Sequence, residues 1–478
     1  MGRFLSLFKP ISRFLPEVSP PTKRLSLGAK LAWTGLVLVI YFIMCEIPLY
    51  GVKITGGDPL LYLRVIFASN RGTLMELGIQ PIVTAGLVLQ LLVASKIIDC
   101  DFTNPEDRAL FTAANKFFSM LLTAVNALAY IIGGVYGGLD FKTAAIVFTQ
   151  LMVAGMILIL LDEMVQKGWG IGSGISLFIL GGVAKNVLWD SLSPLSIGDG
   201  LSHGALIATG QAIAAGNWKA LYDRQGYPTL LGFSATIAVF LAVIYMQGMR
   251  VEIPISYARF RGFRGRYPIS LLYVSNIPVI FTSALFANIY FISQLLWSHY
   301  KDQGIFWLEL LGTFEADPRT GNIRPVGGLV YYIIAPRGIH EVGKLDGPWY
   351  TWGPVRAAIY LTLMVISCGL FAKIWLEVGG LDPATVARQI VDAGLQIPGF
   401  RRSYQAVKRV LERYIPTVTV LGGIIVGLLA AISDFLGVFG TGTGILLSVS
   451  IIYQYYQLLA REQLEAMHPG LAKLLGVR

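Results

Sequence analysis

The amino-acid sequence predicts an all-α, polytopic membrane protein with ten transmembrane helices. Of its 478 residues, 55% are hydrophobic and only 14% are charged, whereas a soluble globular chain carries roughly 25% charged residues. Stretches of about 20 predominantly apolar residues, long enough to cross a bilayer as a helix, recur along the whole chain. The charge deficit and the recurring apolar stretches together exclude a water-soluble globular protein.

The predicted spans fall into two sets of five, joined by a polar, glycine-rich connector at 190–228. An odd number of spans in the first half turns the second half over, so we predict two inverted halves, 1–190 and 191–478, related by a pseudo-two-fold axis in the membrane plane. Proteins built in this way carry their transport site between the halves. The spans cover residues 31–48, 74–97, 115–134, 143–162, 172–189, 229–247, 271–296, 354–376, 416–436 and 441–459.

Positive charge gathers on one side of the predicted membrane. The net charge is +10, and the lysines and arginines concentrate in the N-terminal tail and in the loops after the sixth span (248–270) and the eighth span (377–415). An even number of spans puts both termini on that same side. Loops rich in Lys and Arg stay in the cytoplasm, so we predict cytoplasmic termini, with the tail lying on the inner membrane surface.

One apolar segment, "DPLLYLRVIFASNRG" at 58–72, is too short to span and carries Arg64 at its middle. Asp58 can cap a helix, Pro59 suits its first turn, and Asn70-Arg71-Gly72 ends it. Two interpretations remain open. The segment is either a re-entrant helix at the surface or a movable stopper, because a short helix at membrane depth must be buried in protein or line water.

Two pairs of branched apolar residues share helix faces. Ile79 and Val83 are four residues apart on the second span, and Ile175 and Ile179 are four apart at the start of the fifth. Such pairs are typical of ordinary packing or of lipid contact. They can also form a constriction that seals by excluding water.

The sequence offers little for catalysis or for ion coupling. The polar residues inside spans are few, and interhelical hydrogen bonds explain them. All four histidines lie in loops or tails, which removes a base for an intramembrane protease and the usual proton relays. "GTGTG" at 440–444 lacks the lysine of a phosphate-binding loop. We therefore expect no enzymatic activity, no metal and no cofactor; a secondary transporter remains the alternative to a channel.

The loop "YARFRGFRGRYPIS" at 257–270 resembles a nucleic-acid-binding arm. Its arginines alternate with glycines and aromatic residues, a spacing that suits contact with phosphate groups irrespective of base sequence. A plain topology signal is the alternative, but that role needs only the charge. The arginines are Arg259, Arg261, Arg264 and Arg266.

Several motifs together resemble the SecY family, the channel-forming alpha subunit of the Sec protein translocon. They are "PEVSPPTKRLSLGAKLAWTGLVLVIYF", "RGTLMELGIQPIVTAGLVLQLL", "LDEMVQKGWGIGSGISLFI", "YVSNIPVI", "IPGFRR" and "DFLGVFGTGTGILL". They run from the N-terminal tail to the last span and so cover nearly the whole chain. "LEVGGLDPATVARQI" and the tail "AREQLEAMHPGLAKLL" are similar to the archaeal side of the archaeal and eukaryotic branch.

The resemblance implies four groups of functional residues. The apolar pore ring corresponds to Ile79, Val83, Ile175, Ile179, Ile280 and Leu447. The plug corresponds to 58–70, with Leu60, Leu61, Leu63, Arg64, Val65 and Ile66. The polar positions of the lateral gate, between spans two and three and spans seven and eight, correspond to Thr84, Asn126 and Asn288, where Asn126 departs from the expected Gln. The ribosome-docking residues correspond to the four arginines of 257–270 together with Arg401 and Arg402.

The resemblance also implies a function. A channel of this family translocates secretory polypeptides and releases transmembrane segments sideways into lipid. Its expected partners are a gamma (SecE-like) subunit, a beta subunit, the ribosome through ribosomal RNA and exit-site proteins, signal sequences and nascent chains, and membrane lipids. The expected location is the plasma membrane, with the endoplasmic reticulum as the alternative.

Overall fold

The computed structural model describes most of the chain. The described residues are 8–10, 15–23, 25–52, 64, 68–95, 97–98, 100, 104–133, 135–136, 139–196, 200–224, 227–257, 264–272, 277–300, 305–316, 323–345, 348–396 and 403–467.

Each of the ten predicted spans coincides with a helix. Within the described residues, eight of these helices are long and apolar enough to cross a membrane. The other two are α4, which has 15 residues, and α17, whose last turns are polar and charged. The ten helices are α2 (Leu27–Glu46), α4 (Gln80–Ala94), α5 (Pro105–Ile132), α6 (Phe141–Met164), α7 (Gly174–Leu192), α9 (Leu230–Gly248), α10 (Ile277–Tyr300), α14 (Gly353–Val378), α16 (Tyr404–Phe435) and α17 (Gly442–Met467).

Several helix ends differ from the predicted spans. Helix α4 begins at Gln80 instead of 74, because Gly78 has a φ of 54° and breaks the helix before Pro81. Helix α5 begins near Asn104, whose side chain accepts the Glu106 N–H at 3.0 Å. Helix α16 begins at Tyr404 and continues through Pro416. Hydropathy locates the apolar part of a helix, so the polar turns of α5 and α16 fell outside the predicted spans.

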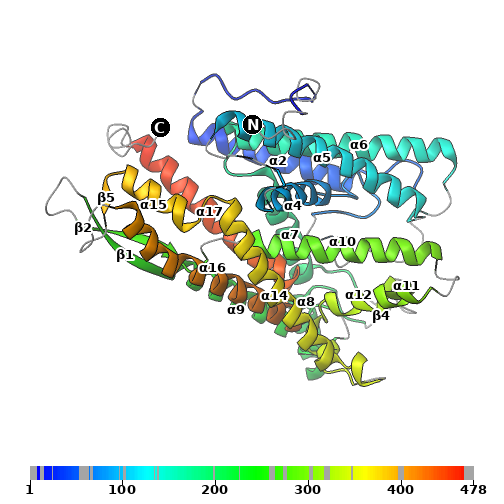
Figure 1. Cartoon of the computed structure of the whole chain (residues 1–478). Coiled ribbons are helices and arrows are strands. Elements are labelled where there is room, and N and C mark those ends of the chain that lie inside the picture. The colour runs from blue at the N-terminus through cyan, green and yellow to red at the C-terminus, as the bar shows by residue number, and fades with distance from the viewer. Residues whose placement is uncertain are drawn as a thin grey trace.

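The long helices form two groups that meet at α10 and α17. Figure 1 shows α2, α4, α5 and α6 on one side of α10, and α9, α14 and α16 on the other. Helix α10 packs against α14 and contacts α4, while α17 packs against α7 as well as α9 and α16. Residues far apart in the sequence therefore line a common centre.

Two small sheets qualify the all-α prediction. One joins β1 (Arg250–Tyr257), β2 (Arg264–Ser270) and β5 (Leu395–Gln396), and the other joins β3 (Thr313–Ala316) and β4 (Ile323–Gly327). In "RVEIPISY" alternate residues face opposite sides, as in a strand: Ile253 is buried with Ile269 beneath α15 (Pro383–Asp392) and α16. The three-stranded sheet lies at one end of the molecule, and β4 lies at the other with α11 and α12 (Figure 1).

The connector and the longest loop contain further short elements. In the connector, Arg224 is buried and donates to the backbone carbonyl oxygens of Ser202 and Pro228, both at 2.8 Å. These hydrogen bonds join the middle of the connector, at Ser202, to its C-terminal end. The short elements are α8 (Ala205–Ala214), α11 (Phe306–Leu311), α12 (Leu329–Ile333), α13 (Gly338–Val342), the 3-10 turns Trp218–Leu221 and Trp349–Thr351, and a π-helical turn, Val165–Trp169, that follows α6.

Candidate functional site

The six residues assigned to a pore ring lie in one hydrophobic cluster at the centre of the molecule. They come from the start of α4 and from α7, α10 and α17. Three of them are at most 2% exposed: Ile79, Ile179 and Leu447. Val83, Ile175 and Ile280 are half-buried and pack against the same cluster. The six residues, from four helices, thus share one large apolar cluster, which also includes residues of α2, α6, α9, α14 and α16.

A buried carboxylate sets the start of α7, which carries two of these residues. Asp162, near the end of α6, accepts hydrogen bonds from the Ile175 N–H at 3.0 Å and the Ser173 hydroxyl at 3.3 Å. Gly172, with a φ of 79°, turns the chain back between the two helices. The sequence "GIGSG" therefore ends one helix and positions the ring residues of the next.

The "GTGTG" segment builds the start of α17 in a similar way. Asp434 at the end of α16 accepts the Gly442 N–H at 2.7 Å and the Tyr360 hydroxyl at 3.2 Å. A side chain on Gly442 would collide with the backbone of α16 at the Ala430 carbonyl oxygen. These glycines let α16 and α17 approach each other, which places Leu447 in the cluster.

The segment before α4 brings a buried ion pair to the edge of the cluster. Arg64 Nη2 lies 2.7 Å from Glu76 Oε1, and both side chains are at most 9% exposed. Ala68 and Met75, which lie between these two residues in the chain, belong to the central cluster. The other predicted plug residues, Leu60, Leu61, Leu63, Val65 and Ile66, lie outside the described residues.

Tyr136 adds a third polar group near this ion pair. Its hydroxyl is buried and has no hydrogen-bond partner among the described residues. Burial, reinforced by the negative charge of Glu76, raises the pKa of Tyr136 above its usual range. The ion pair thus lies among buried groups, with the Tyr136 hydroxyl nearby.

The polar residues assigned to the lateral gate are brought together only in part. Asn288 on α10 donates to the Thr84 hydroxyl on α4 at 3.2 Å and accepts a hydrogen bond from Gln80 Nε2, also at 3.2 Å. Asn126 is half-buried on α5 and takes no part in this network. Gln80 was not predicted as a site residue, but it is the third member of the polar contact between α4 and α10.

Apolar contacts complete the seam between α4 and α5 on one side and α10 and α14 on the other. Leu87 of α4 lies in one cluster with Phe281 of α10 and Phe371 of α14. Near the other end, Tyr130 of α5 stacks on Phe291 of α10 with ring centroids 5.2 Å apart. Most of the described contacts across the seam are therefore apolar. Apolar side chains that separate there can be covered by lipid instead.

The basic loop forms a hairpin whose strand β1 also pairs with β5 of the second basic loop. Ser256 pairs with Gln396 and Tyr257 with Leu395, so the strands that precede the two basic segments are neighbours in one sheet. Arg266 lies on β2 with 75% of its side chain exposed and forms an ion pair of 2.5 Å with Glu252. The side chain of Arg264, and all of Arg259, Arg261, Arg401 and Arg402, lie outside the described residues.

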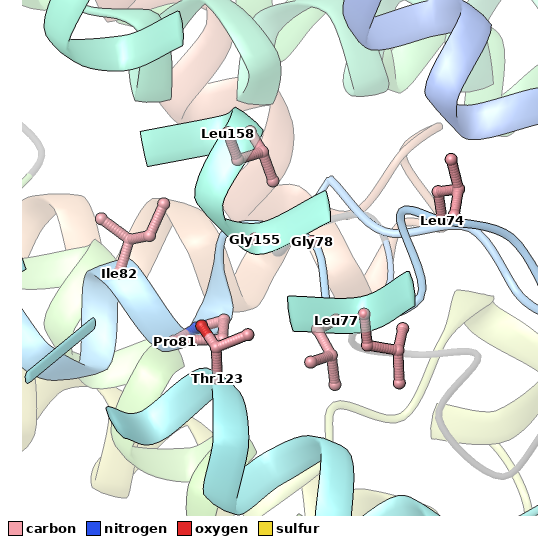
Figure 2. A pocket seen from close by; sticks show the side chains of 9 residues that line it. Leu74, Leu77, Gly78, Pro81, Ile82, Thr123, Gly155 and Leu158 are labelled. Atoms are coloured by element: carbon pink, nitrogen blue, oxygen red, sulfur yellow. The ribbon is translucent and has the colours of Figure 1, made fainter. Parts of the chain in front are cut away.

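Two hollows lie beside the start of α4 and along α6. Figure 2 shows a cavity of about 10 Å³ between the start of α4, Thr123 of α5 and Gly155 of α6, room for about one water molecule. A groove of about 450 Å³ runs along α6 from Ala145 to Ile157, with Leu74 at its edge. Ring residues line neither space, in keeping with a closed centre. No group of three potential metal ligands occurs in the described part of the chain.

Glu76 and Gln80 are the site residues that sequence reasoning missed. Glu76 lies inside the predicted span 74–97, and an ionisable residue there requires a partner. Arg64 lies at the middle of the apolar stretch just upstream and needs a partner for the same reason, so the pair could have been predicted. Gln80 gave no such signal, because a Gln beside a Pro at the start of a helix is unremarkable in sequence.

Comparison with known proteins agrees with this architecture. A profile of the SecY family matches residues 73–456, from the turn before α4 well into α17. The chain belongs to the SecY family. A second profile, described as the plug domain of Sec61p, matches residues 39–72 and so includes the segment that carries Arg64.

Curated relatives align with this SecY-family chain nearly end to end. The protein translocase subunit SecY of Pyrococcus horikoshii is 47% identical over 479 residues, which cover 97% of each chain. The SEC61 subunit alpha of Neurospora crassa is 43% identical over 472 residues, covering 96% of this chain and 97% of that one. The chain therefore lies in the archaeal and eukaryotic branch, as its motifs predicted.

Solved structures give the same result. One described as a protein conducting channel superposes with a TM-score of 0.80 at 40% identity, covering 97% of this chain and 99% of that one. Sec61 in the canine ribosome-channel complex from the endoplasmic reticulum superposes with a TM-score of 0.77 at 40% identity over the same shares. The predicted fold class is confirmed, as is a protein-transport channel that is not an enzyme, and the transporter alternative has no support.

Proposed function

We propose that this chain passes unfolded polypeptides across a membrane through the ring of Ile79, Val83, Ile175, Ile179, Ile280 and Leu447. The observation that carries the proposal is the convergence of these residues, from four helices, on one cluster between the two helix groups. In this account the halves 1–190 and 191–478 separate slightly to open the ring. A bilayer-spanning polar path then runs between them.

An apolar ring suits a substrate without fixed side-chain chemistry. A specific binding pocket would reject most polypeptides, whereas branched aliphatic side chains make only non-directional contacts. At rest such a constriction excludes water and therefore ions. When a chain is inserted, the same side chains surround it and limit the leak.

We propose further that apolar segments leave sideways between α4 and α5 on one side and α10 and α14 on the other. A helix exposed there chooses between water and lipid according to its transfer free energy. The gain is about 0.3–0.6 kcal/mol for each Leu, Ile, Phe or Val, and the cost is about 2.5–3.5 kcal/mol for a central Asp, Lys or Arg. The seam through Leu87, Phe281 and Phe371 is apolar, so the buried polar groups that opening has to separate are those of Gln80, Thr84 and Asn288.

The basic sheet at one end of the molecule is the proposed ribosome-docking surface. β1 joins the loops that carry Arg259, Arg261, Arg264 and Arg266 on one side and Arg401 and Arg402 on the other. The Sec61 of the canine structure is described within a ribosome-channel complex. Arginines bind RNA phosphates irrespective of the base sequence. We expect a SecE-like gamma subunit and a beta subunit as the other stable partners.

The proposed location is the plasma membrane, with both termini and the basic sheet in the cytoplasm. The positive charge of the tail and of loops 248–270 and 377–415 supports this orientation. The endoplasmic reticulum is the alternative, since relatives of comparable identity come from both Pyrococcus and Neurospora.

Reconstitution tests the proposed function. The chain, co-expressed with its small subunits, is placed in proteoliposomes and supplied with ribosomes bearing a secretory nascent chain. Protection of that chain from added protease is the expected result. A nascent chain that stays fully digestible, while ribosomes bind normally, would overturn the proposal.

A further inference from the structure

The N-terminal tail runs across α5 and the end of α6 before it enters α2. Residues 15–23 form neither helix nor strand. Lys116 of α5 donates a hydrogen bond to the Pro16 carbonyl oxygen at 2.7 Å. A little further along the tail, the Val18 N–H donates to Glu163 Oε2 of α6 at 3.3 Å. The short stretch from Pro16 to Val18 is therefore bonded to both helices.

The carboxylate of Glu163 is the centre of these contacts. Its Oε2 also lies 2.9 Å from Lys116 Nζ, and its Oε1 lies 3.0 Å from Lys167 Nζ in the π-helical turn after α6. The side chains of Lys116 and Glu163 are only 10% and 11% exposed. Removing one partner of such a pair leaves the other charge buried without compensation. Glu163 thus joins the tail, α5 and the turn after α6 through contacts that are costly to break.

The tail is also bonded to the π-helical turn itself. Trp169 Nε1 donates to the Ser19 carbonyl oxygen at 2.8 Å, and Lys167 forms an ion pair of 2.5 Å with Glu17. The Trp169 ring contacts Trp33 of α2 edge to face, with ring centroids 5.3 Å apart. Residues 16–19 are therefore held along their length and not at a single contact.

Helices α5 and α6 also approach each other away from the tail. A Cβ atom on Gly155 of α6 would collide with the Thr123 side chain of α5. At the tail, two residues of fully extended chain reach about 7 Å, so α5 cannot swing far from α6 while Pro16 and Val18 keep their bonds. The proposed exit lies between α4 and α5 on one side and α10 and α14 on the other, so its opening does not require α5 to leave α6.

We propose that tail residues 16–18, Lys116 and Glu163 form a clasp that fastens α5 to α6, so that α5 opens the exit only as part of an α5–α6 unit. The inference rests on the proposed sideways exit and deepens it. Lys116 and Glu163 are positioning residues for α5. Because the clasp keeps α5 and α6 together, an apolar segment leaves toward lipid on one side of α5 only.

Distances between spin labels test the clasp. The three native cysteines are replaced by alanine, and the channel is reconstituted with its small subunits. Labels at Ala109→Cys on α5 and Leu160→Cys on α6 report the clasped pair of helices, and labels at Ala109→Cys and Lys373→Cys on α14 report the exit. Ala109 and Lys373 are exposed and Leu160 is half-buried. We expect a narrow 109–160 distribution at rest. When a ribosome stalled on a secretory chain engages the channel, only the 109–373 distance should lengthen.

Two variants loosen the clasp from different sides. Lys116→Met removes the ammonium group that bonds the Pro16 carbonyl oxygen and Glu163, and it keeps the apolar stem. Val18→Pro removes the N–H that Glu163 accepts and leaves the ion pair in place. We expect both to broaden the 109–160 distribution at rest, whereas Lys116→Arg, which retains a cation with donors for both partners, should keep it narrow.

Three results would overturn the clasp. They are an unchanged distribution in Lys116→Met, an unchanged distribution in Val18→Pro, and a distribution in Lys116→Arg as broad as that in Lys116→Met. Lys185→Met is the matched control, since it breaks an ion pair of 2.5 Å with Glu46 between α7 and α2 of the same half. We expect it to leave the 109–160 distribution narrow; broadening there would show general loosening and would also overturn the clasp.

The two label pairs separate failure of the clasp from failure of the proposed function. If the 109–373 distance does not lengthen in the wild-type channel while a nascent chain is translocated, the proposed exit is wrong. If it lengthens and the 109–160 distance lengthens with it, α5 opens without α6 and only the clasp is wrong.

Discussion

At the scale of single residues, the candidate site contains two kinds of side chain, buried apolar residues and hydrogen-bonded polar residues. Ile79 and Ile179 are at most 2% exposed and belong to the central apolar cluster. Gln80, Thr84 and Asn288 form the polar contact across the seam. In the proposed mechanism the first set seals the pore by its shape and apolar character, and the second forms the hydrogen bonds that opening of the seam has to break.

Polar substitution in the ring is expected to make the resting channel leak. In Ile79→Asn with Ile179→Asn, amide groups hydrate a constriction that branched aliphatic groups keep dry. We expect resting ion conductance in planar bilayers to rise several-fold. Ile179→Leu keeps the volume and the apolar character and should keep the seal. A tight membrane with the Asn pair would show that these residues do not close the pore.

Loss of the polar contact across the seam is expected to ease sideways release. Gln80→Ala removes one hydrogen bond to Asn288, a net loss of about 1 kcal/mol, or roughly fivefold in the opening equilibrium. Marginally apolar test segments should integrate into lipid more often, as read from glycosylation-site or protease-site mapping. Asn126→Ala is the matched control, since Asn126 lies outside the network. Equal effects of both substitutions would contradict a specific role for Gln80.

At the scale of elements, the sequence predicted where helices exist better than where they begin. All ten spans were placed by their apolar stretches, because burial in lipid requires long apolar runs. The starts of α4, α5 and α16 were displaced, since turns made by Gly78, the cap at Asn104 and the polar turns of α16 carry no hydropathy signal. The hairpin β1–β2 was not predicted, because its arginines were interpreted only as a source of charge. The alternation of Ile253 with its neighbours is the signal that identifies a strand.

The sequence could identify individual residues of the candidate site, but it could not predict which of them contact one another. The six proposed ring residues were assigned from their motifs, but their membership of one apolar cluster depends on how α10 and α17 pack against the other helices. The pairing of Arg64 with Glu76, and the replacement of Asn126 by Gln80 in the seam, depend on distances between segments. Such distances arise from packing and do not follow from local sequence.

The arginines of the hairpin are expected to bind the ribosome electrostatically. Reversing the charge of Arg261, Arg264 and Arg266 with Glu should weaken co-sedimentation with ribosomes and flatten its salt dependence, by roughly one unit of slope for each phosphate that an arginine no longer neutralises. The chain should still assemble and insert. Lys219→Glu, an exposed side chain on a connector outside the sheet, serves as the control. Ribosome binding that matches wild type at every salt concentration would refute the docking role.

Deletion of the plug segment should affect gating more than folding. In the sequence, residues 60–69 lie between α2 and the turn at Asn70, outside the ten long helices. We expect the deleted channel to express, to bind its partners and to flicker open at rest in single-channel recordings. Loss of expression instead would identify the segment as a structural helix, the first of the two interpretations left open by the sequence.

At the scale of the whole molecule, the two helix groups form a closed shell around an apolar centre. The contacts of α10 and α17 join the two groups (Figure 1), and in the proposed mechanism a small separation of the groups opens the ring and the seam together. The docking sheet lies at one end of this shell. A chain that emerges from a ribosome bound there would meet the ring directly beneath it.

Site-specific photo-crosslinking tests the central claim, passage through this ring, most directly. A photoreactive side chain is placed at position 79, 179 or 447 in turn, and a ribosome stalled on a secretory chain is engaged with the reconstituted channel. The account predicts crosslinks to the nascent chain from all three positions, and none from Leu241, whose side chain is 60% exposed on the outer face of α9. Equal capture at Leu241, or no capture at the three ring positions while the chain is translocated, would contradict it.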